Sequence, residues 1–302
     1  MSRCGILLST YNGAAFLGPF LESLEAQTFR DWMLVWRDDG STDETVALMT
    51  AWGATQGARF RAVIAPSGNL GVTVSFMTLL RAASAMPFVA FADQDDVWLP
   101  EKLAWGIDSL TQVPPGTPAL YCARQILVDR TLTRTGLSPA LPDDAGFPAS
   151  LTQNIATGCT LLLNGPAITL VSASQPPALT WHDWWCYLMV TAAGGRVIRD
   201  DRGVILYRQH GANAVGAAGS APRRAMAAMR RGPAAFMRVF RANVAALTGE
   251  SAVTPAARQA LVTITLGLEG GLAAKRRALR LRGLVRTSWV QTQLFRLWFL
   301  IG

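Results

Sequence analysis

The sequence contains few of the residues that form disulfide bridges or structural zinc sites: four cysteines and two histidines among 302 residues. No Cys-x-x-Cys pair occurs, and no spacing of cysteine and histidine fits a zinc site. The cysteines also lie far apart along the chain. We therefore expect free thiols in a reducing cytoplasm rather than disulfide bridges.

Long hydrophobic runs are also missing. The chain reaches Ile6-Leu7-Leu8 almost at once, without the long apolar stretch and cleavage site of a secretory signal. No window approaches the roughly 18 uninterrupted apolar residues that a membrane-spanning helix needs. Because 50% of the residues are hydrophobic, a sizeable core is available. We expect a cytoplasmic protein that is soluble or peripheral to a membrane.

Acidic residues are scarce in one part of the chain only. Residues 1–221 carry 14 Lys and Arg against 18 Asp and Glu, a net charge of −4. Residues 222–302 carry 14 basic residues against two acidic ones, a net charge of +12. This asymmetry predicts an acidic domain over residues 1–215 and a basic amphipathic helical region over residues 222–302.

The first 130 residues alternate short apolar runs with amphipathic stretches, which predicts an α/β fold with a mainly parallel sheet flanked by helices. Ser41, followed three residues later by Glu44, predicts a capping box at the start of the second helix. The expected strands are Gly5–Ser9, Trp32–Trp36, Phe60–Ala65, Pro87–Ala92 and Leu120–Val128. The expected helices are Ala14–Ala26, Asp43–Ala54, Val72–Ala85 and Glu101–Thr111.

The later sequence is less regular. Residues 131–152 are rich in proline, glycine and aspartate, which favours a loop. Thr157–Leu163 and Val204–Tyr207 are expected to be strands, and Trp181–Ala193 a helix. After a small-residue boundary at 214–220, the pattern predicts a C-terminal helical extension. Its expected interruptions are Gly232-Pro233, Gly249, Gly270-Gly271 and Gly283.

Polar motifs follow the first, second and fourth expected strands: Ser9–Asn12, Asp38–Ser41 and Asp93–Asp96. Right-handed crossovers bring these strand ends to one edge of the sheet, where open α/β sheets bind ligands. Clustered carboxylates are costly there unless a cation neutralises them, and they would repel a diphosphate on their own. A divalent cation shared with a substrate diphosphate satisfies both conditions. A solvated acidic turn is the simpler alternative.

Together these motifs resemble those of the inverting family 2 glycosyltransferases, over about residues 4–215. The form Asp93-Gln94-Asp95-Asp96-Val97-Trp98 is similar to the rhamnosyltransferase-like branch of that family. The resemblance implies a GT-A fold, a nucleotide-diphosphate sugar donor (dTDP-rhamnose or a UDP-sugar) and Mg²⁺ or Mn²⁺. The other motifs that carry it are Ser9-Thr10-Tyr11-Asn12-Gly13, Gln27-Thr28-Phe29, Asp38-Asp39-Gly40-Ser41-Thr42-Asp43 and Asn69-Leu70-Gly71.

The resemblance also implies roles for the donor-side residues. Thr10 and Asp39 would contact the nucleoside base, Asp93 the ribose or donor sugar, and Asp95 the metal. The simpler alternative is turn and helix-cap chemistry for Thr10 and a turn beside Gly40 for Asp39, although the position of Asp39 at a strand end favours function. Arg208 would clamp the diphosphate, unless it pairs with Asp200 or Asp201. His210 would supply a further metal ligand or a phosphate contact.

Asp183 matches the position of the catalytic base of the family. The segment is Trp181-His182-Asp183-Trp184-Trp185, where the family more often has Glu-Asp, so the role of His182 stays open. Inverting transfer needs a base for the acceptor hydroxyl, and aromatic walls would raise the pKa of such a carboxylate. The simpler alternative is that the negative charge of Asp183 only stabilises the N-terminus of a helix through the helix dipole. Thr157-Gly158-Cys159 resembles the acceptor-side strand.

The basic tail allows two interpretations. Arginines recur beside apolar residues in a pattern that suits the anionic inner leaflet of the cytoplasmic membrane. Alternatively, solvated arginines cover helices that pack on the catalytic domain. Membrane contact would bring the enzyme to lipid-linked acceptors.

These observations predict a metal-dependent inverting glycosyltransferase that acts on a saccharide or lipid-linked acceptor in cell-surface polysaccharide synthesis. A nucleotidyltransferase on a related fold would need a cationic loop after the first strand, yet residues 9–13 contain no Lys or Arg. The Gly-x-x-x-x-Gly-Lys motif of NTPases is missing as well. A nucleic-acid binder using the tail is a third candidate, whose affinity would collapse with added salt. The acidic body makes specific nucleic-acid binding the weakest of the three.

Overall fold

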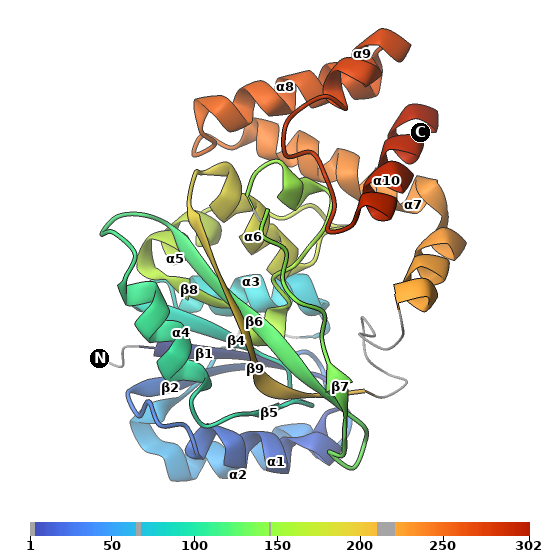
Figure 1. Ribbon diagram of the computed structural model, residues 1–302. Coiled ribbons are helices and arrows are strands. Elements are labelled where there is room, and N and C mark those ends of the chain that lie inside the picture. Colours follow the sequence, from blue (N-terminus) through green and yellow to red (C-terminus); the bar gives the residue numbers. More distant parts are fainter. Residues whose placement is uncertain (1–3, 65–67, 145, 210–220) are drawn as a thin grey trace.

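The computed structural model describes residues 4–64, 68–144, 146–209 and 221–302, with side chains in the last range from residue 232. A mixed sheet with the order β3-β2-β1-β4-β8-β6-β9-β5 forms its centre, and β7 pairs with β6 at the side. Helices cover both faces, and four further helices stand at one end of the sheet (Figure 1).

The first half of the sheet is parallel, as expected. Its strands are β1 (Cys4–Thr10), β2 (Trp32–Asp38), β3 (Phe60–Ala62) and β4 (Phe88–Ala92). Every residue of β4 is buried, which explains its unbroken apolar sequence. Alternate residues of these strands enter two separate cores, because successive side chains of a strand point to opposite faces.

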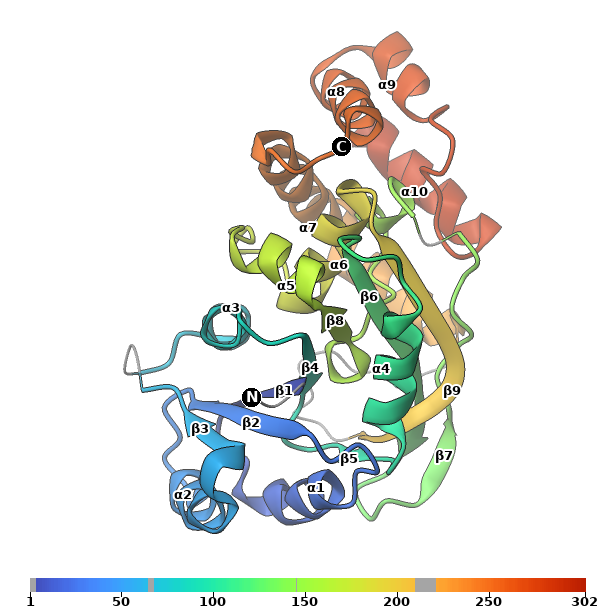
Figure 2. The ribbon, with the colours of Figure 1, turned by 90° about the vertical axis from the view of Figure 1, so that its left-hand side faces the viewer.

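The two faces are covered by different helices. Leu7 and Val35 belong to a core with α3 (Val72–Ala82), whereas Ile6 and Leu34 belong to a core with α1 (Ala14–Glu25). Figure 2 shows α1 and α2 (Thr45–Gln56) on one side of the parallel strands and α3 on the other. This double cover leaves only the ends of the strands open for polar chemistry.

The second half of the sheet mixes directions. β8 (Leu162–Asn164) runs antiparallel to β4 and to β6 (Ala119–Val128), while β9 (Arg196–Arg208) runs parallel to β6. The short strands β5 (Val97–Trp98) and β7 (Arg134–Leu137) pair antiparallel with β9 and β6. The helices of this half are α4 (Lys102–Thr111), α5 (Gly165–Ser172) and α6 (His182–Ala192).

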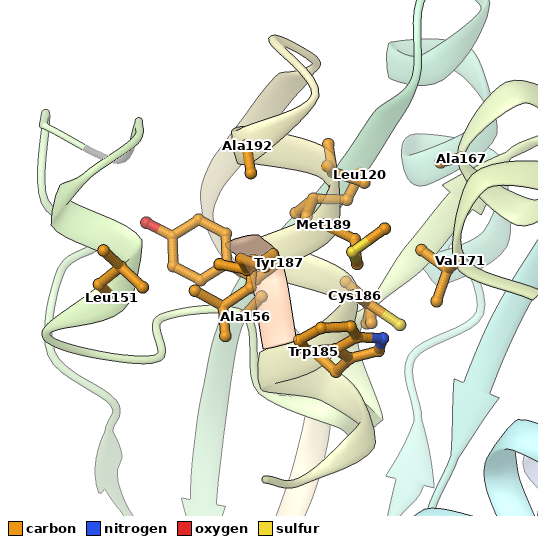
Figure 3. Close-up of a cluster of buried hydrophobic side chains, with 14 of the residues drawn as sticks. Leu120, Leu151, Ala156, Ala167, Val171, Trp185, Cys186, Tyr187, Met189 and Ala192 are labelled. Atoms are coloured by element: carbon orange, nitrogen blue, oxygen red, sulfur yellow. The ribbon is translucent and has the colours of Figure 1, made fainter. Parts of the chain in front are cut away.

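Helix α6 is the most deeply buried helix of this half, with nine of its eleven residues inaccessible. Figure 3 shows Trp185, Tyr187 and Met189 pointing from α6 into a cluster with side chains of other elements. Those partners include Leu120 of β6 and Val171 of α5. The packing fixes α6 firmly and with it the residues at its N-terminus.

Several sequence predictions are wrong in detail. Thr157–Leu163 is not one strand, because Gly158–Thr160 forms a 3₁₀ helix before β8 begins. The expected loop 131–152 contains β7 and a 3₁₀ helix at Ala149–Leu151, and β5 and α5 were not predicted. The last strand is 13 residues long rather than four.

The predicted capping box is also wrong. Helix α2 begins at Thr45, and its N-cap residue Glu44 makes no capping hydrogen bond through its side chain. The Ser41 hydroxyl instead donates to Asp38 (2.6 Å) and accepts from the Asn12 amide (2.9 Å). Tertiary partners therefore replace the local bond that the spacing favours.

The C-terminal helices are α7 (Ala221–Gly249), α8 (Pro255–Glu269), α9 (Leu272–Ala278) and α10 (Trp289–Ile301). The predicted interruptions are confirmed, and the one inside α7 is a kink where Gly232 has φ 77° before Pro233. Apolar residues of α7 such as Phe240 and Leu247 share one buried cluster with α6. These helices therefore pack on the sheet domain, as the second interpretation of the tail expects.

No helix within the described ranges is long and apolar enough to cross a membrane.

Candidate active site

The ends of β1, β2 and β4 lie side by side, as the sequence predicts. Thr10 is paired with Asp38, and Leu8 with both Trp36 and Ala92. The three polar motifs therefore leave the sheet at the same edge. This edge is where the candidate site residues gather.

Thr10 lies inside this edge rather than on it. Its side chain is fully buried. Its hydroxyl donates to Asp38 (3.0 Å) and accepts from the Trp36 indole (2.9 Å). Asp38 in turn accepts from the amides of Gly40 (3.0 Å) and Ser41 (2.7 Å). Thr10 thus ties β1 to the turn after β2, and its contact with a nucleoside base stays a prediction.

Asp39 joins three segments of the chain. Its buried carboxylate pairs with Arg37 at 2.5 Å and accepts from the Ser75 hydroxyl of α3 (3.1 Å). It also accepts from the amides of Leu70 (2.8 Å) and Gly71 (2.9 Å). The Asn69-Leu70-Gly71 motif is therefore fixed against β2 by Asp39. Binding of the nucleoside base by Asp39 remains a prediction.

Gln94 clamps the first motif, a role that the sequence did not reveal. Its amide group accepts from the Tyr11 amide (3.0 Å) and donates to the Tyr11 carbonyl (2.9 Å). A Cβ atom at Gly13 would come within 2.2 Å of the Gln94 carbonyl oxygen. The glycine therefore leaves room for a side chain that bridges the loops after β1 and β4.

Asp93, Asp96 and Cys159 bring one ligand atom each within 4.8 Å of one another. Burial, together with the charges of Asp95 and Asp183, raises the pKa of Asp93 to about 7. Asp96 is fully buried, and its Oδ2 atom has no hydrogen-bond partner within the described ranges. Burial raises its pKa well above the ordinary range, and burial also raises the pKa of the Cys159 thiol.

Lys102 lies beneath this cluster at the start of α4. Its side chain is fully buried, and its Nζ atom stands 3.1 Å from the centre of the Trp98 ring. Burial lowers its pKa to about 7, although the neighbouring groups Cys159, Cys4, Asp96 and Asp93 act in the opposite direction. The amine therefore offsets part of the negative charge at the end of β4.

Arg208 at the end of β9 holds the acidic turn in place. Its Nε donates to the Asp95 carbonyl (3.0 Å), its Nη1 to the Arg130 carbonyl (2.6 Å), and its own amide to the Asp96 carboxylate (3.3 Å). The guanidinium is almost entirely buried above the Phe16 ring. Asp200, one of the two alternative partners considered for Arg208, instead binds Arg202 and the Tyr121 hydroxyl.

Asp183 occupies the first turn of α6. Its carboxylate accepts from the amides of Gly158 (3.0 Å) and Trp184 (2.6 Å). Burial raises its pKa to about 6, although these amides act in the opposite direction. Its charge in turn raises the pKa of Asp93, so the two carboxylates interact electrostatically across the site.

The aromatic neighbours of Asp183 belong largely to the core. Trp185 is fully buried, while Trp184 is half-buried and donates to the Ser150 carbonyl (2.8 Å). His182 stacks on Phe76, with 4.1 Å between the ring centres, and burial lowers its pKa to about 3. A neutral, packed imidazole explains how histidine can stand where the family more often has glutamate.

The oxygen atoms of the Asp93–Asp96 turn suit a hard divalent cation, which prefers carboxylate ligands. The buried Oδ2 atom of Asp96 is one acceptor that such an ion or its water shell would satisfy. Cys159 fits less well, because its raised pKa keeps it a thiol. His210, the other predicted ligand, lies outside the described residues.

Comparisons with known proteins agree with this geometry. The sequence model described as "Glycosyl transferase family 2" matches residues 6–115. The chain is 27% identical over 228 residues to the dTDP-rhamnosyl transferase RfbG of Shigella flexneri, and the match covers 70% of this chain and 74% of that protein.

Solved structures share the fold. TarS of S. aureus in complex with UDP-GlcNAc superposes with a TM-score of 0.60 at 14% identity, covering 92% of this chain and 78% of that chain. Mannosyltransferase PcManGT from Pyrobaculum calidifontis, in complex with GDP-Man and Mn²⁺, gives 0.52 at 18% identity, covering 99% of this chain and 86% of that one. The predicted GT-A fold is confirmed, with the C-terminal helices as an extension of it. The motifs, the fold and the sequence matches together show that the chain is a glycosyltransferase, similar over residues 6–115 to glycosyltransferase family 2.

Proposed function

We propose that this enzyme transfers a sugar, with inversion, from a nucleotide-diphosphate donor to a hydroxyl of a saccharide acceptor. The observation that carries the proposal is the arrangement of Asp183 and Asp93. Burial raises the pKa of both carboxylates, one at the N-terminus of α6 and one directly after β4, and the charge of Asp183 adds to the shift of Asp93. The first belongs to the acceptor side and the second to the donor side.

Asp183 is the proposed catalytic base. The amides of Gly158 and Trp184 fix the orientation of its carboxylate. Because its pKa is about 6, it is mostly ionised at neutral pH and yet more basic than a solvated aspartate. It takes the proton of the acceptor hydroxyl while the oxygen of that hydroxyl attacks the anomeric carbon opposite the leaving group.

The donor side is proposed to bind Mg²⁺ or Mn²⁺ through Asp95, with Asp93 on the ribose or donor sugar and His210 as a further ligand. Such an ion, when bound, stabilises the negative charge of the departing diphosphate as a Lewis acid. Arg208 contributes in a second way, because it holds the Asp95 backbone in place. Thr10 and Asp39 are proposed to define the nucleoside pocket.

Rhamnose from dTDP-rhamnose is the proposed donor sugar. The support is the likeness to RfbG, whose name describes a dTDP-rhamnosyl transferase, together with the Asp-Gln-Asp-Asp-x-Trp motif at Asp93–Trp98. We place the enzyme at the inner face of the cytoplasmic membrane, where it extends a lipid-linked precursor of a cell-surface polysaccharide. The basic C-terminal helices support that location.

The test replaces Asp183 with asparagine, which keeps the shape of the side chain and removes its basicity. Loss of a general base lowers kcat by about 10²- to 10⁴-fold. Donor binding is measured separately by thermal shift with nucleotide diphosphates, with and without Mn²⁺, since a bound ligand raises the melting temperature. We expect Asp183→Asn to lose transfer while nucleotide diphosphates raise its melting temperature as much as that of the wild type. In both proteins dTDP should give the largest rise. Near-normal turnover of Asp183→Asn would remove Asp183 from the mechanism.

A further inference from the structure

Helix α10 is apolar on both of its faces. Its inner face buries Phe295 and Phe299 against Phe240 of α7. Its outer face exposes Trp289 (75%), Val290 (68%), Leu297 (52%) and Ile301 (65%) to solvent. The outer side of a surface helix is normally polar, so the four exposed apolar residues on the outer face require an explanation.

The exposed residues form one continuous stripe. At about 100° per residue, Trp289, Val290, Leu297 and Ile301 fall on the same side of the helix, with the half-buried Gln293 between them. The stripe runs the length of a 13-residue helix, and the only charged residue in that helix is Arg296. Single exposed apolar residues are ordinary on protein surfaces, but a stripe of this kind marks an interaction site.

Positive charge lies near the C-terminal end of the stripe. The Nζ atom of Lys275 in α9 donates to the Leu300 carbonyl (2.8 Å), which places α9 against the C-terminal end of α10. Residues 251–302 contain eight basic residues and one acidic residue, Glu269. Four arginines of α9 and of the segment leading to α10 are exposed, namely Arg276, Arg277, Arg280 and Arg282.

We infer that the outer face of α10, together with these four arginines, is a docking surface for an anionic lipid bilayer. The apolar stripe enters the boundary between headgroups and acyl chains, and the arginines bind lipid phosphates. The inference deepens the proposed function by naming the surface that would hold the enzyme at the membrane. The observations that support it are the exposed apolar residues of α10 and the four exposed arginines.

The charge distribution favours a lipid surface over a second copy of this chain. A symmetric dimer through this face would bring two strongly basic regions together. An anionic bilayer instead supplies both an apolar interior for the stripe and negative charge for the arginines. The surface also lies beyond α5 and α6, at the end of the molecule opposite α2 (Figures 1 and 2).

The experiment sediments the full-length protein with vesicles of phosphatidylcholine alone or mixed with phosphatidylglycerol. Wild-type protein is expected to pellet with the anionic vesicles only and to be released by salt. Replacing Arg277 and Arg280 with glutamine should weaken binding roughly five-fold for each arginine. The double change Trp289→Ser and Leu297→Ser should weaken it by about ten-fold or more.

Leu48→Ser is the matched control, because Leu48 is an exposed apolar residue of α2 at the far end of the molecule. It should bind vesicles as wild type does. All variants should melt near the wild-type temperature and keep activity toward a soluble saccharide acceptor, because none of these residues lies at the candidate active site. This separates the two proposals, since absent transferase activity with intact vesicle binding would contradict only the proposed function.

Three results would overturn the docking surface. Wild-type protein could remain in the supernatant with anionic vesicles, or the α10 variants could pellet as wild type does. Alternatively, light scattering could show a dimer that Trp289→Ser dissociates, with no vesicle binding, which would assign the stripe to self-association.

Discussion

Asp183 combines burial with two hydrogen bonds to backbone amides, and these act on its pKa in opposite directions. Burial prevails and raises the value to about 6. At the scale of single residues, a pKa raised in this way is what the proposed role of Asp183 as proton acceptor requires. Burial, together with the charges of Asp95 and Asp183, also raises the pKa of Asp93, to about 7.

The pH dependence of turnover follows from the Asp183 value. A base acts in its ionised form, so kcat should be constant well above pH 6 and fall about ten-fold per pH unit below it. The measurement is kcat at saturating donor and acceptor between pH 5 and pH 8, with donor binding followed separately by thermal shift. A kcat that stays flat down to pH 5 would contradict the assignment.

Residue types at the strand ends were predictable, but their partners were not. The positions of Asp93 and Asp183 followed from motifs with a characteristic order and spacing. The Gln94 clamp on Tyr11 joins residues 83 positions apart, and the Lys102 amine meets the acidic cluster through the packing of α4. Such contacts depend on how elements are placed in space, which local patterns do not encode.

At the scale of elements, the N-terminus of α6 is held from two sides. The Thr180 hydroxyl donates to Asn243 of α7 (2.5 Å), and both residues are buried. The Thr180 carbonyl accepts from Thr73 of α3 (3.2 Å). Helix α7 therefore positions the segment that carries Asp183, although it contributes no group to the predicted chemistry.

Thr180→Val tests this coupling, since valine keeps the shape and removes the hydroxyl. We expect kcat to fall about ten-fold with an unchanged KM for the donor, because a small displacement of a catalytic group is costly. Thr180→Ser should restore most of the activity. Thr248→Val in the same helix is the control, because the hydroxyl of Thr248 bonds only within α7. Equal kcat values in all three variants would exclude a positioning role.

The elements that sequence patterns predicted best are those with buried, regular strands. β1, β2 and β4 were placed to within about two residues, because the runs are apolar and bounded by turn residues. β9 was predicted too short because its first half is polar and contains a bulge between Asp200 and Gly203. The 3₁₀ turn at Gly158–Thr160 was predicted as part of a strand, because it directly precedes the apolar run of β8 and its own residues are buried.

At the scale of the whole molecule, the tail and the sheet domain share a core. Phe240, Val244 and Leu247 of α7 belong to the same buried cluster as Leu7 of β1. The Thr152 hydroxyl donates to the Val285 carbonyl (2.6 Å), and Arg286 donates to the Thr152 carbonyl (2.8 Å). The division into residues 1–215 and 222–302 stays a prediction, and this shared core argues that the two regions form one cooperative unit.

A fragment of residues 1–220 tests that point. Removing α7 to α10 uncovers apolar surface on α6 and its neighbours, so the fragment should aggregate or melt well below the full chain. Size-exclusion chromatography and thermal unfolding provide the measurement, and co-expression of residues 221–302 should restore a soluble complex. A monomeric fragment that melts as the full chain does would establish two independent domains.

The burial of all four cysteines has a practical consequence at this scale. Cys4, Cys122, Cys159 and Cys186 are inaccessible, and burial raises the pKa of each thiol. Thiol-directed dyes react with exposed thiolates, so the native protein should stay unlabelled. A cysteine introduced at position 48 or 289 would then accept a single fluorophore, which allows distance measurements on an otherwise unaltered chain.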